Sequence, residues 1–154
     1  MKKSILLHSP EETEAYAAAI GSRLKGGECL ELTSDIGGGK TTFTRGLLRG
    51  MGSDALVSSP TFTIGKQYPA GVLTVYHFDF YRLQEPGIVA EELLESLADS
   101  KAVIVIEWGS TMHGVLPKQR ILIEIEKTAE SDSQRKITMN TPSEFMYVSE
   151  GISA

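Results

Sequence analysis

The segment from 34 to 42, which reads Ser-Asp-Ile-Gly-Gly-Gly-Lys-Thr-Thr, is the part of the sequence best suited to chemistry. In a phosphate-binding loop, glycines let successive backbone N–H groups curl around a phosphate, a lysine reaches the phosphate oxygens, and a Ser or Thr hydroxyl binds Mg²⁺. Gly39, Lys40 and Thr41 fill the last three positions of the Walker A pattern G-x-x-x-x-G-K-[ST]. We therefore predict that the amides of residues 37 to 42 line an anion site at the positive end of the following helix.

Ser34 departs from the strict Walker A pattern, which has Gly at this position. Serine fits if its backbone stays at negative φ, so we expect a cost in affinity or loop rigidity and not a loss of binding. The alternative interpretation is that Gly-Gly-Gly forms only a flexible turn. That alternative does not explain Lys40 at a helix start, where its charge opposes the helix dipole unless an anion is present.

Two acidic residues follow apolar runs of strand length. Glu107 ends the run 102–106 in the manner of a Walker B segment, and Asp79 follows the run 72–78. Nucleotide hydrolysis needs carboxylates at the ends of neighbouring strands, one for the Mg²⁺ shell and one for the attacking water. Either acid alone could be a solvated charge at a strand end, and the division of the two roles stays open. The predicted catalytic residues are Lys40, Asp79 and Glu107, and the predicted metal-binding residues are Thr41 and Glu107.

Three further residues near these motifs are secondary candidates. Thr61 lies in Ser58–Thr63, between the loop helix and the next strand, where a sensor of the γ-phosphate often lies; a Ser/Pro turn followed by strand is the alternative. His77 on a strand is more often packed than catalytic. Trp108 could stack on a base, face a partner or pack in the core. The residues predicted to bind the nucleotide are Asp35, Ile36, Gly37, Gly38, Gly39, Lys40, Thr41, Thr42 and Thr61.

The periodicity of apolar residues predicts the elements that must position these groups. Ser9 and Pro10 begin a helix that Gly26-Gly27 ends, a second helix runs from the loop to Gly52, and a third carries Leu93 and Leu97. The predicted strands are 3–7, 28–33, 72–78 and 102–106, and a hairpin pairs 121–126 with 136–139 across a polar connection at 127–135. Strand, helix, strand order implies a parallel sheet. We predict an α/β, P-loop NTPase-like three-layer sandwich with a mostly parallel central sheet and a C-terminal antiparallel hairpin.

Length and composition limit the class of protein. A chain of 154 residues with 41% apolar and 23% charged residues predicts one domain over 1–154, with a tail at 150–154 that frays. No apolar run reaches the roughly 20 residues of a membrane helix, so we expect a cytoplasmic protein without a membrane segment. The single Cys29 excludes an internal disulfide and offers no ligand spacing for zinc. The net charge of −5 disfavours autonomous nucleic-acid binding.

Taken together, four motifs resemble the TsaE family, formerly called YjeE, over about residues 1 to 126. The motifs are Asp-Ile-Gly-Gly-Gly-Lys-Thr-Thr-Phe-Thr-Arg-Gly at 35–46, Ser-Pro-Thr-Phe at 59–62, His-Phe-Asp-Phe-Tyr-Arg at 77–82 and Glu-Trp at 107–108. The family usually has Gly at position 34, and Gly109-Ser110-Thr111 stands where Pro or an acid is expected after Glu-Trp.

The resemblance implies an ATPase with ATP and Mg²⁺ as cofactors. It acts with the TsaD and TsaB proteins in forming threonylcarbamoyladenosine at position 37 of tRNAs reading ANN codons, and it contacts tRNA only indirectly, through the complex. The family's ATPase supports turnover of the transferase and is not thought to make or transfer the threonylcarbamoyl group. By position, the resemblance implies that Thr41 binds Mg²⁺ and that Thr61 is a switch residue. It also implies hydrolysis-linked roles for Asp79 and Glu107, and phosphate binding by Gly37, Gly39, Lys40 and Thr42.

Three other functions are compatible with a phosphate loop. A small-molecule kinase needs a compact, arginine-bearing lid, whereas Arg82, Arg120 and Arg135 are scattered. A GTPase is disfavoured because the only asparagine, Asn140, does not lie in an N-K-x-D motif. A nonhydrolysing nucleotide-binding scaffold is the third alternative, and Ser34 makes it conceivable.

Overall fold

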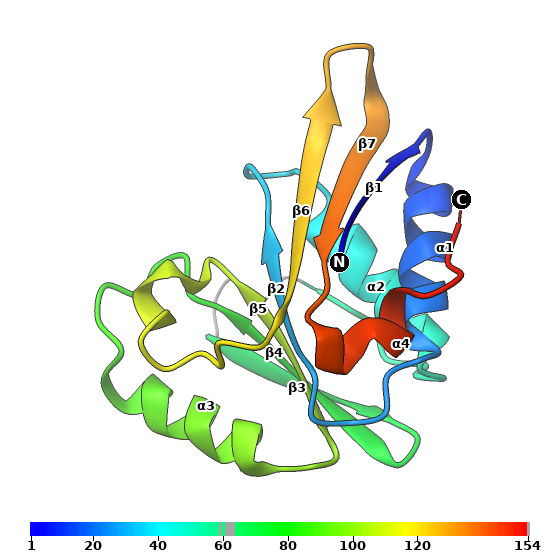
Figure 1. Cartoon of the computed structure of the whole chain (residues 1–154). Helices are drawn as coiled ribbons and strands as arrows, with labels where there is room; N and C mark the ends of the chain where they lie inside the picture. Colours follow the sequence, from blue (N-terminus) through cyan, green and yellow to red (C-terminus); the bar gives the residue numbers. More distant parts are fainter. Residues whose placement is uncertain (59, 61–63, 154) are drawn as a thin grey trace.

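The computed structural model describes residues 1–58, 60 and 64–153. Within these residues, seven strands form one sheet in the order β1-β7-β6-β2-β5-β4-β3 (Figure 1). The strands are β1 (Lys2–Leu7), β2 (Cys29–Thr33), β3 (Gly65–Ala70), β4 (Leu73–Asp79), β5 (Ala102–Glu107), β6 (Ile121–Thr128) and β7 (Ser131–Asn140). The helices are α1 (Pro10–Gly21), α2 (Lys40–Gly50), α3 (Gly87–Ala98) and α4 (Met146–Ser149), with 3-10 turns η1 (Gly109–Met112) and η2 (Ser143–Phe145).

The sheet is parallel at its centre and antiparallel at both edges. Strands β6, β2, β5 and β4 run parallel, β3 pairs antiparallel with β4, and β7 pairs antiparallel with both β6 and β1. This arrangement confirms the predicted α/β class, the parallel centre and the C-terminal hairpin. It also brings the carboxyl ends of β2, β5 and β4 to one edge of the sheet, where ligands bind in open α/β folds.

Helices cover both faces of the sheet and enclose two apolar cores. On one face α1, α2 and α4 bury one cluster of side chains, which includes Leu30 and Leu32 of β2. On the other face α3 and η1 bury a second cluster around Ile104 and Ile106 of β5. The three layers are visible in Figure 1. In the described part of the chain, no helix has the length and apolar character needed to cross a bilayer.

Close packing between α1 and α2 fixes the helix that follows the phosphate loop. A Cβ atom on Gly46 or Gly50 of α2 would lie 2.3 or 2.0 Å from a carbonyl oxygen of α1. A Cβ atom on Gly21 would lie 2.1 Å from the Leu47 carbonyl oxygen, so this glycine also permits the close approach. Helix α1 ends at Gly21, so the predicted end at Gly26-Gly27 was wrong by about one turn.

The structure confirms the start of α1 and corrects two other boundaries. Ser9 caps α1 by accepting a hydrogen bond from the Glu12 amide at 3.1 Å. The predicted connection at 127–135 was too long, because β6 continues to Thr128 and β7 begins at Ser131. Strand β3 was not predicted; it returns through a turn at Gly71, whose φ of 63° suits glycine, and Val72 lies in that turn rather than in a strand.

Candidate phosphate-binding site

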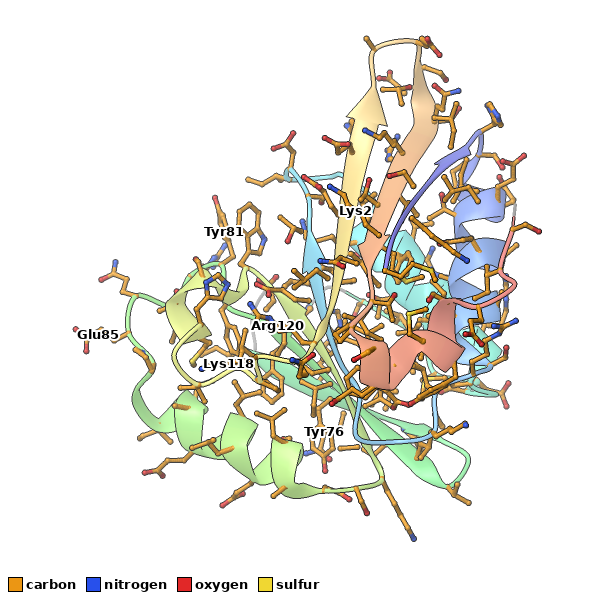
Figure 2. All side chains as sticks on the ribbon, in the orientation of Figure 1. Lys2, Tyr76, Tyr81, Glu85, Lys118 and Arg120 are labelled. Carbon is orange, nitrogen blue, oxygen red and sulfur yellow. The ribbon has the colours of Figure 1, made fainter. Side chains whose placement is uncertain are left out.

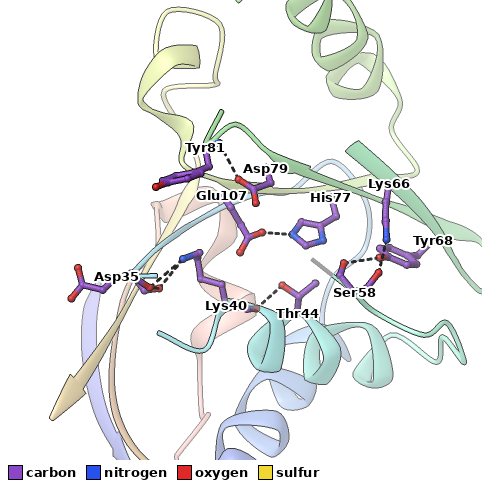
Figure 3. A network of polar contacts seen from close by, with 11 residues as sticks. Asp35, Lys40, Thr44, Ser58, Lys66, Tyr68, His77, Asp79, Tyr81 and Glu107 are labelled. Carbon is purple, nitrogen blue, oxygen red and sulfur yellow. Dashed lines mark hydrogen bonds and ion pairs between the residues drawn. The ribbon is translucent and has the colours of Figure 1, made fainter. Parts of the chain in front are cut away.

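The predicted phosphate loop connects the carboxyl end of β2 to the first residue of α2. Beside it, Asp79 and Glu107 are the last residues of the neighbouring strands β4 and β5, and they are partners in the strand register. A cleft of about 600 Å³ lies between the loop and these strand ends. It is lined by Ile36, Gly37, Gly38, Gly39, Lys40, Thr41, Thr42, Pro60, Ile64, Asp79, Tyr81, Arg82, Leu83, Glu107 and Trp108. The structure thus brings the loop and both acids together (Figure 3).

The backbone of the loop has the conformation of an anion-binding nest. Gly37 and Gly39 have φ values of 73° and 109°, which L side chains rarely adopt. Gly38 must lack a side chain for a different reason, because a Cβ atom there would lie 2.4 Å from the Ser34 hydroxyl oxygen. Left-handed residues within such a loop turn successive N–H groups toward one concave side. The three glycines are therefore required by the shape of the loop.

Ser34 is accommodated within the loop. Its hydroxyl donates to the Asp35 carbonyl oxygen at 2.8 Å and accepts a hydrogen bond from Lys40 Nζ at 3.0 Å. Its φ is not positive, which is the condition that we set for a serine at this position. Asp35 does not line the cleft; its carbonyl oxygen accepts the Gly38 amide at 2.9 Å and closes the turn.

Lys40 holds a positive charge at the base of the cleft. The side chain is buried, and in the part of the chain that the structure describes Nζ forms hydrogen bonds with two neutral oxygens, the Ser34 hydroxyl and, at 3.5 Å, the Asp35 carbonyl. Nζ also lies 4.9 Å from the centre of the Trp108 ring. Among the described residues no carboxylate forms an ion pair with it. A buried ammonium group in this setting favours an anionic ligand.

Glu107 is held by a buried histidine. Its Oε2 lies 2.9 Å from His77 Nε2, and both side chains are almost completely buried. His77 Nδ1 has no hydrogen-bond partner within the described residues. The carboxylate oxygen can accept a proton from Nε2, and this hydrogen bond fixes the Glu107 side chain against the ring. His77 was only a secondary candidate in the sequence, and here it orients a catalytic candidate.

Asp79 lies at the end of the next strand, more open to the cleft than Glu107. Its Oδ1 accepts a hydrogen bond from the Tyr81 amide at 3.0 Å. Burial raises the pKa of Asp79; the Tyr81 amide opposes this shift, and the negative charge of Glu107 adds to it. Two adjacent carboxylates that differ in burial and in partners are suited to different roles in one reaction.

Aromatic residues form the outer wall of the cleft. Trp108 has a φ of 56°, the only positive value at a non-glycine among the described residues. Such a conformation at a bulky residue is unfavourable and often marks a functional site. The Tyr81 ring projects outward after β4 (Figure 2) and lies 4.9 Å from the Trp108 ring. Trp108 is half-buried on the cleft wall and does not pack in the core.

The remaining candidates separate into three groups. Thr61 lies outside the described residues. Arg82 lines the cleft. Arg120 (Figure 2) instead donates to Glu31 of β2 at 2.6 Å and to the Pro117 carbonyl oxygen at 2.9 Å. Arg135, which the sequence did not single out as a site residue, contacts the phosphate loop. Among the described residues, no cluster of three or more His, Cys, Asp or Glu side chains is arranged to hold a metal.

Comparisons with known proteins identify a family and a similar solved structure. Residues 7–137 match the family model for threonylcarbamoyl adenosine biosynthesis protein TsaE. The Bacillus subtilis tRNA threonylcarbamoyladenosine biosynthesis protein TsaE is 40% identical over 131 residues, which cover 84% of this chain and 80% of that protein. The protein of the same name from Rickettsia bellii is 34% identical over 136 residues, with coverage of 88% and 92%. The crystal structure of Bacillus subtilis YdiB superposes with a TM-score of 0.79 at 33% identity, covering 96% of this chain and 91% of that one.

Proposed function

The chain belongs to the TsaE family of threonylcarbamoyl adenosine biosynthesis proteins, and from this premise we propose that it is an ATPase that binds and hydrolyses Mg-ATP. Its place in tRNA threonylcarbamoyladenosine biosynthesis follows from the family. The observation that carries the proposal is Lys40, a buried cation without a carboxylate partner in the described part of the chain. It follows directly on the Gly39 amide, which has no acceptor among the described residues. A triphosphate supplies the negative charge that this arrangement lacks.

The donor set at the cleft fits magnesium. Mg²⁺ prefers oxygen ligands and is usually held by one or two protein groups together with phosphate oxygens and water. A dedicated cluster of three acidic or imidazole side chains is therefore not required. We assign the Thr41 hydroxyl to the metal and the Glu107 carboxylate to its water shell, because the His77 hydrogen bond fixes that carboxylate at the cleft. When bound, Mg²⁺ would withdraw charge from the phosphate oxygens.

The protein groups divide the remaining work of hydrolysis. The loop amides and Lys40 bind and orient the triphosphate, with Thr42 and the other loop residues completing the nest. Asp79 accepts the proton of the attacking water, because its carboxylate is the more open of the two and its Oδ2 has no partner within the described residues. Thr61 is the proposed sensor of the γ-phosphate.

Two variants test how the acids share these roles. Glu107→Gln is expected both to lower kcat and to raise the Mg²⁺ concentration needed for half-maximal phosphate release, whereas Asp79→Asn should lower kcat without changing that Mg²⁺ concentration. Identical Mg²⁺ titrations for both variants would contradict the assignment. Phosphate release without any acceptor molecule also distinguishes an ATPase from a kinase, and binding without release would indicate a nonhydrolysing scaffold.

We further propose that the protein acts in the cytoplasm with TsaD and TsaB and meets tRNA only through that complex. The acidic net charge of −5 supports indirect contact, since the surface as a whole repels a phosphate backbone. The test is co-purification of the three proteins, followed by a tRNA-modification assay. Modification should depend on ATP hydrolysis and fall in the Lys40→Ala variant; modification at the normal rate would contradict the proposal.

A further inference from the structure

Arg135 connects the antiparallel edge of the sheet to the phosphate loop. It lies on β7, and its Nε donates to the Gly38 carbonyl oxygen at 2.7 Å, across 97 positions in the sequence. Another nitrogen of the same guanidinium group, NH1, donates to the carbonyl oxygens of Asp132 at 2.5 Å and Gln134 at 2.8 Å. The group is therefore fixed to its own strand on one side and to the loop on the other.

This contact determines how the peptide between Gly38 and Gly39 is oriented. In a trans peptide the C=O and N–H groups point in opposite directions. Because the Gly38 carbonyl faces Arg135, the Gly39 N–H points away from Arg135. Arg135 Nε would lie 3.5 Å from a Cβ atom on Gly39, so the guanidinium packs directly against the loop. The Gly39 amide has no protein acceptor within the described residues.

A loop of three consecutive glycines needs such a constraint. Glycine populates positive and negative φ about equally, so the peptides between glycines can rotate at little cost. The Gly38 amide bonds to the Asp35 carbonyl and fixes the preceding peptide, and the Phe43 amide bonds to the Gly39 carbonyl and fixes the following one. Among the described residues, neither bond holds the Gly38–Gly39 peptide itself. Arg135 supplies the missing constraint from outside the loop.

We propose that Arg135 is a positioning residue, which holds the Gly38–Gly39 peptide so that the Gly39 N–H is available to the triphosphate. This inference rests on the proposed binding of Mg-ATP. Arginine is suited to the role because its planar fork bonds the loop and the strand at once, whereas a lysine would bring the charge without the fixed geometry. Arg135 does not touch the reacting atoms in this arrangement.

The test compares the wild type with Arg135→Ala and Arg135→Lys. Titration calorimetry gives the Kd for Mg-ATP, and NMR of the ¹⁵N-labelled protein follows the Gly39 amide. We expect about tenfold weaker binding for Arg135→Ala, from one misplaced amide, and a clear weakening for Arg135→Lys even though its charge is kept. In both ligand-free variants the Gly39 amide resonance should move, and the shift caused by Mg-ATP should shrink.

Arg23→Ala is the matched control. Arg23 also donates to two backbone carbonyl oxygens, those of Tyr147 and Glu150, outside the cleft. The Arg23→Ala variant should have a Tm lowered about as much as that of Arg135→Ala, and its Kd for Mg-ATP should equal the wild-type value. A Kd for Arg135→Ala within about twofold of the wild type would overturn the inference, and so would Arg135→Lys binding like the wild type, since charge alone would then suffice. If the wild type does not bind Mg-ATP, the proposed function fails instead.

Discussion

Two glutamates are buried at opposite ends of neighbouring strands, and their surroundings differ. Glu28 precedes β2 at the amino end of the sheet and is fully buried. Its Oε1 accepts the Lys25 amide at 2.8 Å and the Tyr147 hydroxyl at 2.5 Å, and its Oε2 accepts the Gly26 amide at 2.9 Å. Both oxygens are used, so the carboxylate ties a turn and the C-terminal α4 to the sheet.

Glu107 ends β5 at the other end of the sheet and uses only one oxygen. His77 occupies Oε2, and Oε1 has no partner within residues 1–58, 60 and 64–153. Oε1 is not one of the described buried side-chain atoms that lack a partner, so it is open to the cleft and available to a ligand there. The comparison teaches that burial alone does not identify a functional acid. What distinguishes Glu107 from Glu28 is a carboxylate oxygen at the cleft that has no hydrogen-bond partner among the described residues.

The largest expected effect is on turnover in Glu107→Gln. Glutamine keeps the size of the side chain but removes the charge proposed for the metal's water shell. We expect kcat for ATP hydrolysis to fall by about a thousandfold, while Tm stays close to the wild-type value. Steady-state phosphate release and thermal unfolding measure the two quantities. A fall of less than about tenfold would place Glu107 with Glu28 among the structural acids.

Glu28→Ala should give the reverse pattern. The substitution leaves two backbone amides and the Tyr147 hydroxyl without their acceptor, and each orphaned group is costly. We expect the free energy of unfolding to fall by about 3 kcal/mol. Urea denaturation measures this change, and kcat of the folded protein at low temperature should match the wild type. A large loss of kcat without a loss of stability would erase the contrast between the two acids.

Lys40→Ala tests the cation that faces Glu107 across the cleft. Removing its charge-assisted contact should weaken Mg-ATP binding by about 2 to 3 kcal/mol. Lys25→Ala is the control, because Lys25 Nζ also lies over an aromatic ring, 4.3 Å from the centre of Tyr147, outside the cleft. Titration calorimetry should show unchanged binding for that control. Equal affinities for the Lys40 variant and the wild type would argue against phosphate binding at the loop.

The sequence predicted the elements whose signal is local. The alternation of apolar residues in β2, the continuous apolar run of β5 and the Gly-Lys-Thr run of the loop are each contained in a few residues, and the structure places them as expected. Strand β3 was missed because its sequence, Gly-Lys-Gln-Tyr-Pro-Ala, has little apolar alternation and contains a proline. Its pairing depends on the turn at Gly71 and on the partner strand.

The missed parts of the site are contacts between distant segments. His77 and Glu107 are 30 positions apart, and Arg135 and Gly38 are 97 apart. Nothing in the local pattern around Arg135 indicates that its guanidinium reaches a loop glycine, because that contact follows from the order of strands in the sheet. Asp79 and Glu107 were predictable as a pair only because parallel strands end at the same edge.

The smallest expected effect is a pH dependence of stability at the amino end of the sheet, where Tyr147 is bound to Glu28. Burial raises the pKa of the Tyr147 hydroxyl, and its hydrogen bond to Glu28 and the charge of that carboxylate add to the shift. The folded state therefore keeps the Tyr147 proton at a pH where the unfolded chain, with an ordinary pKa of about 10, has released it. The stabilisation is complete below about pH 10 and is lost as the pH rises above that value.

Tyr147→Phe removes this linkage. We expect the variant to be less stable than the wild type at neutral pH, and the gap in the free energy of unfolding to narrow above about pH 10. Urea denaturation across that range measures the gap, in which the titration of all other groups cancels. In a Glu28→Gln background the same substitution should have less effect at every pH, because the acceptor charge is gone. A gap that stays constant with pH would mean that Glu28 does not hold the Tyr147 proton. The full set of hydrogen bonds to Glu28 could then no longer explain how Glu28 differs from Glu107.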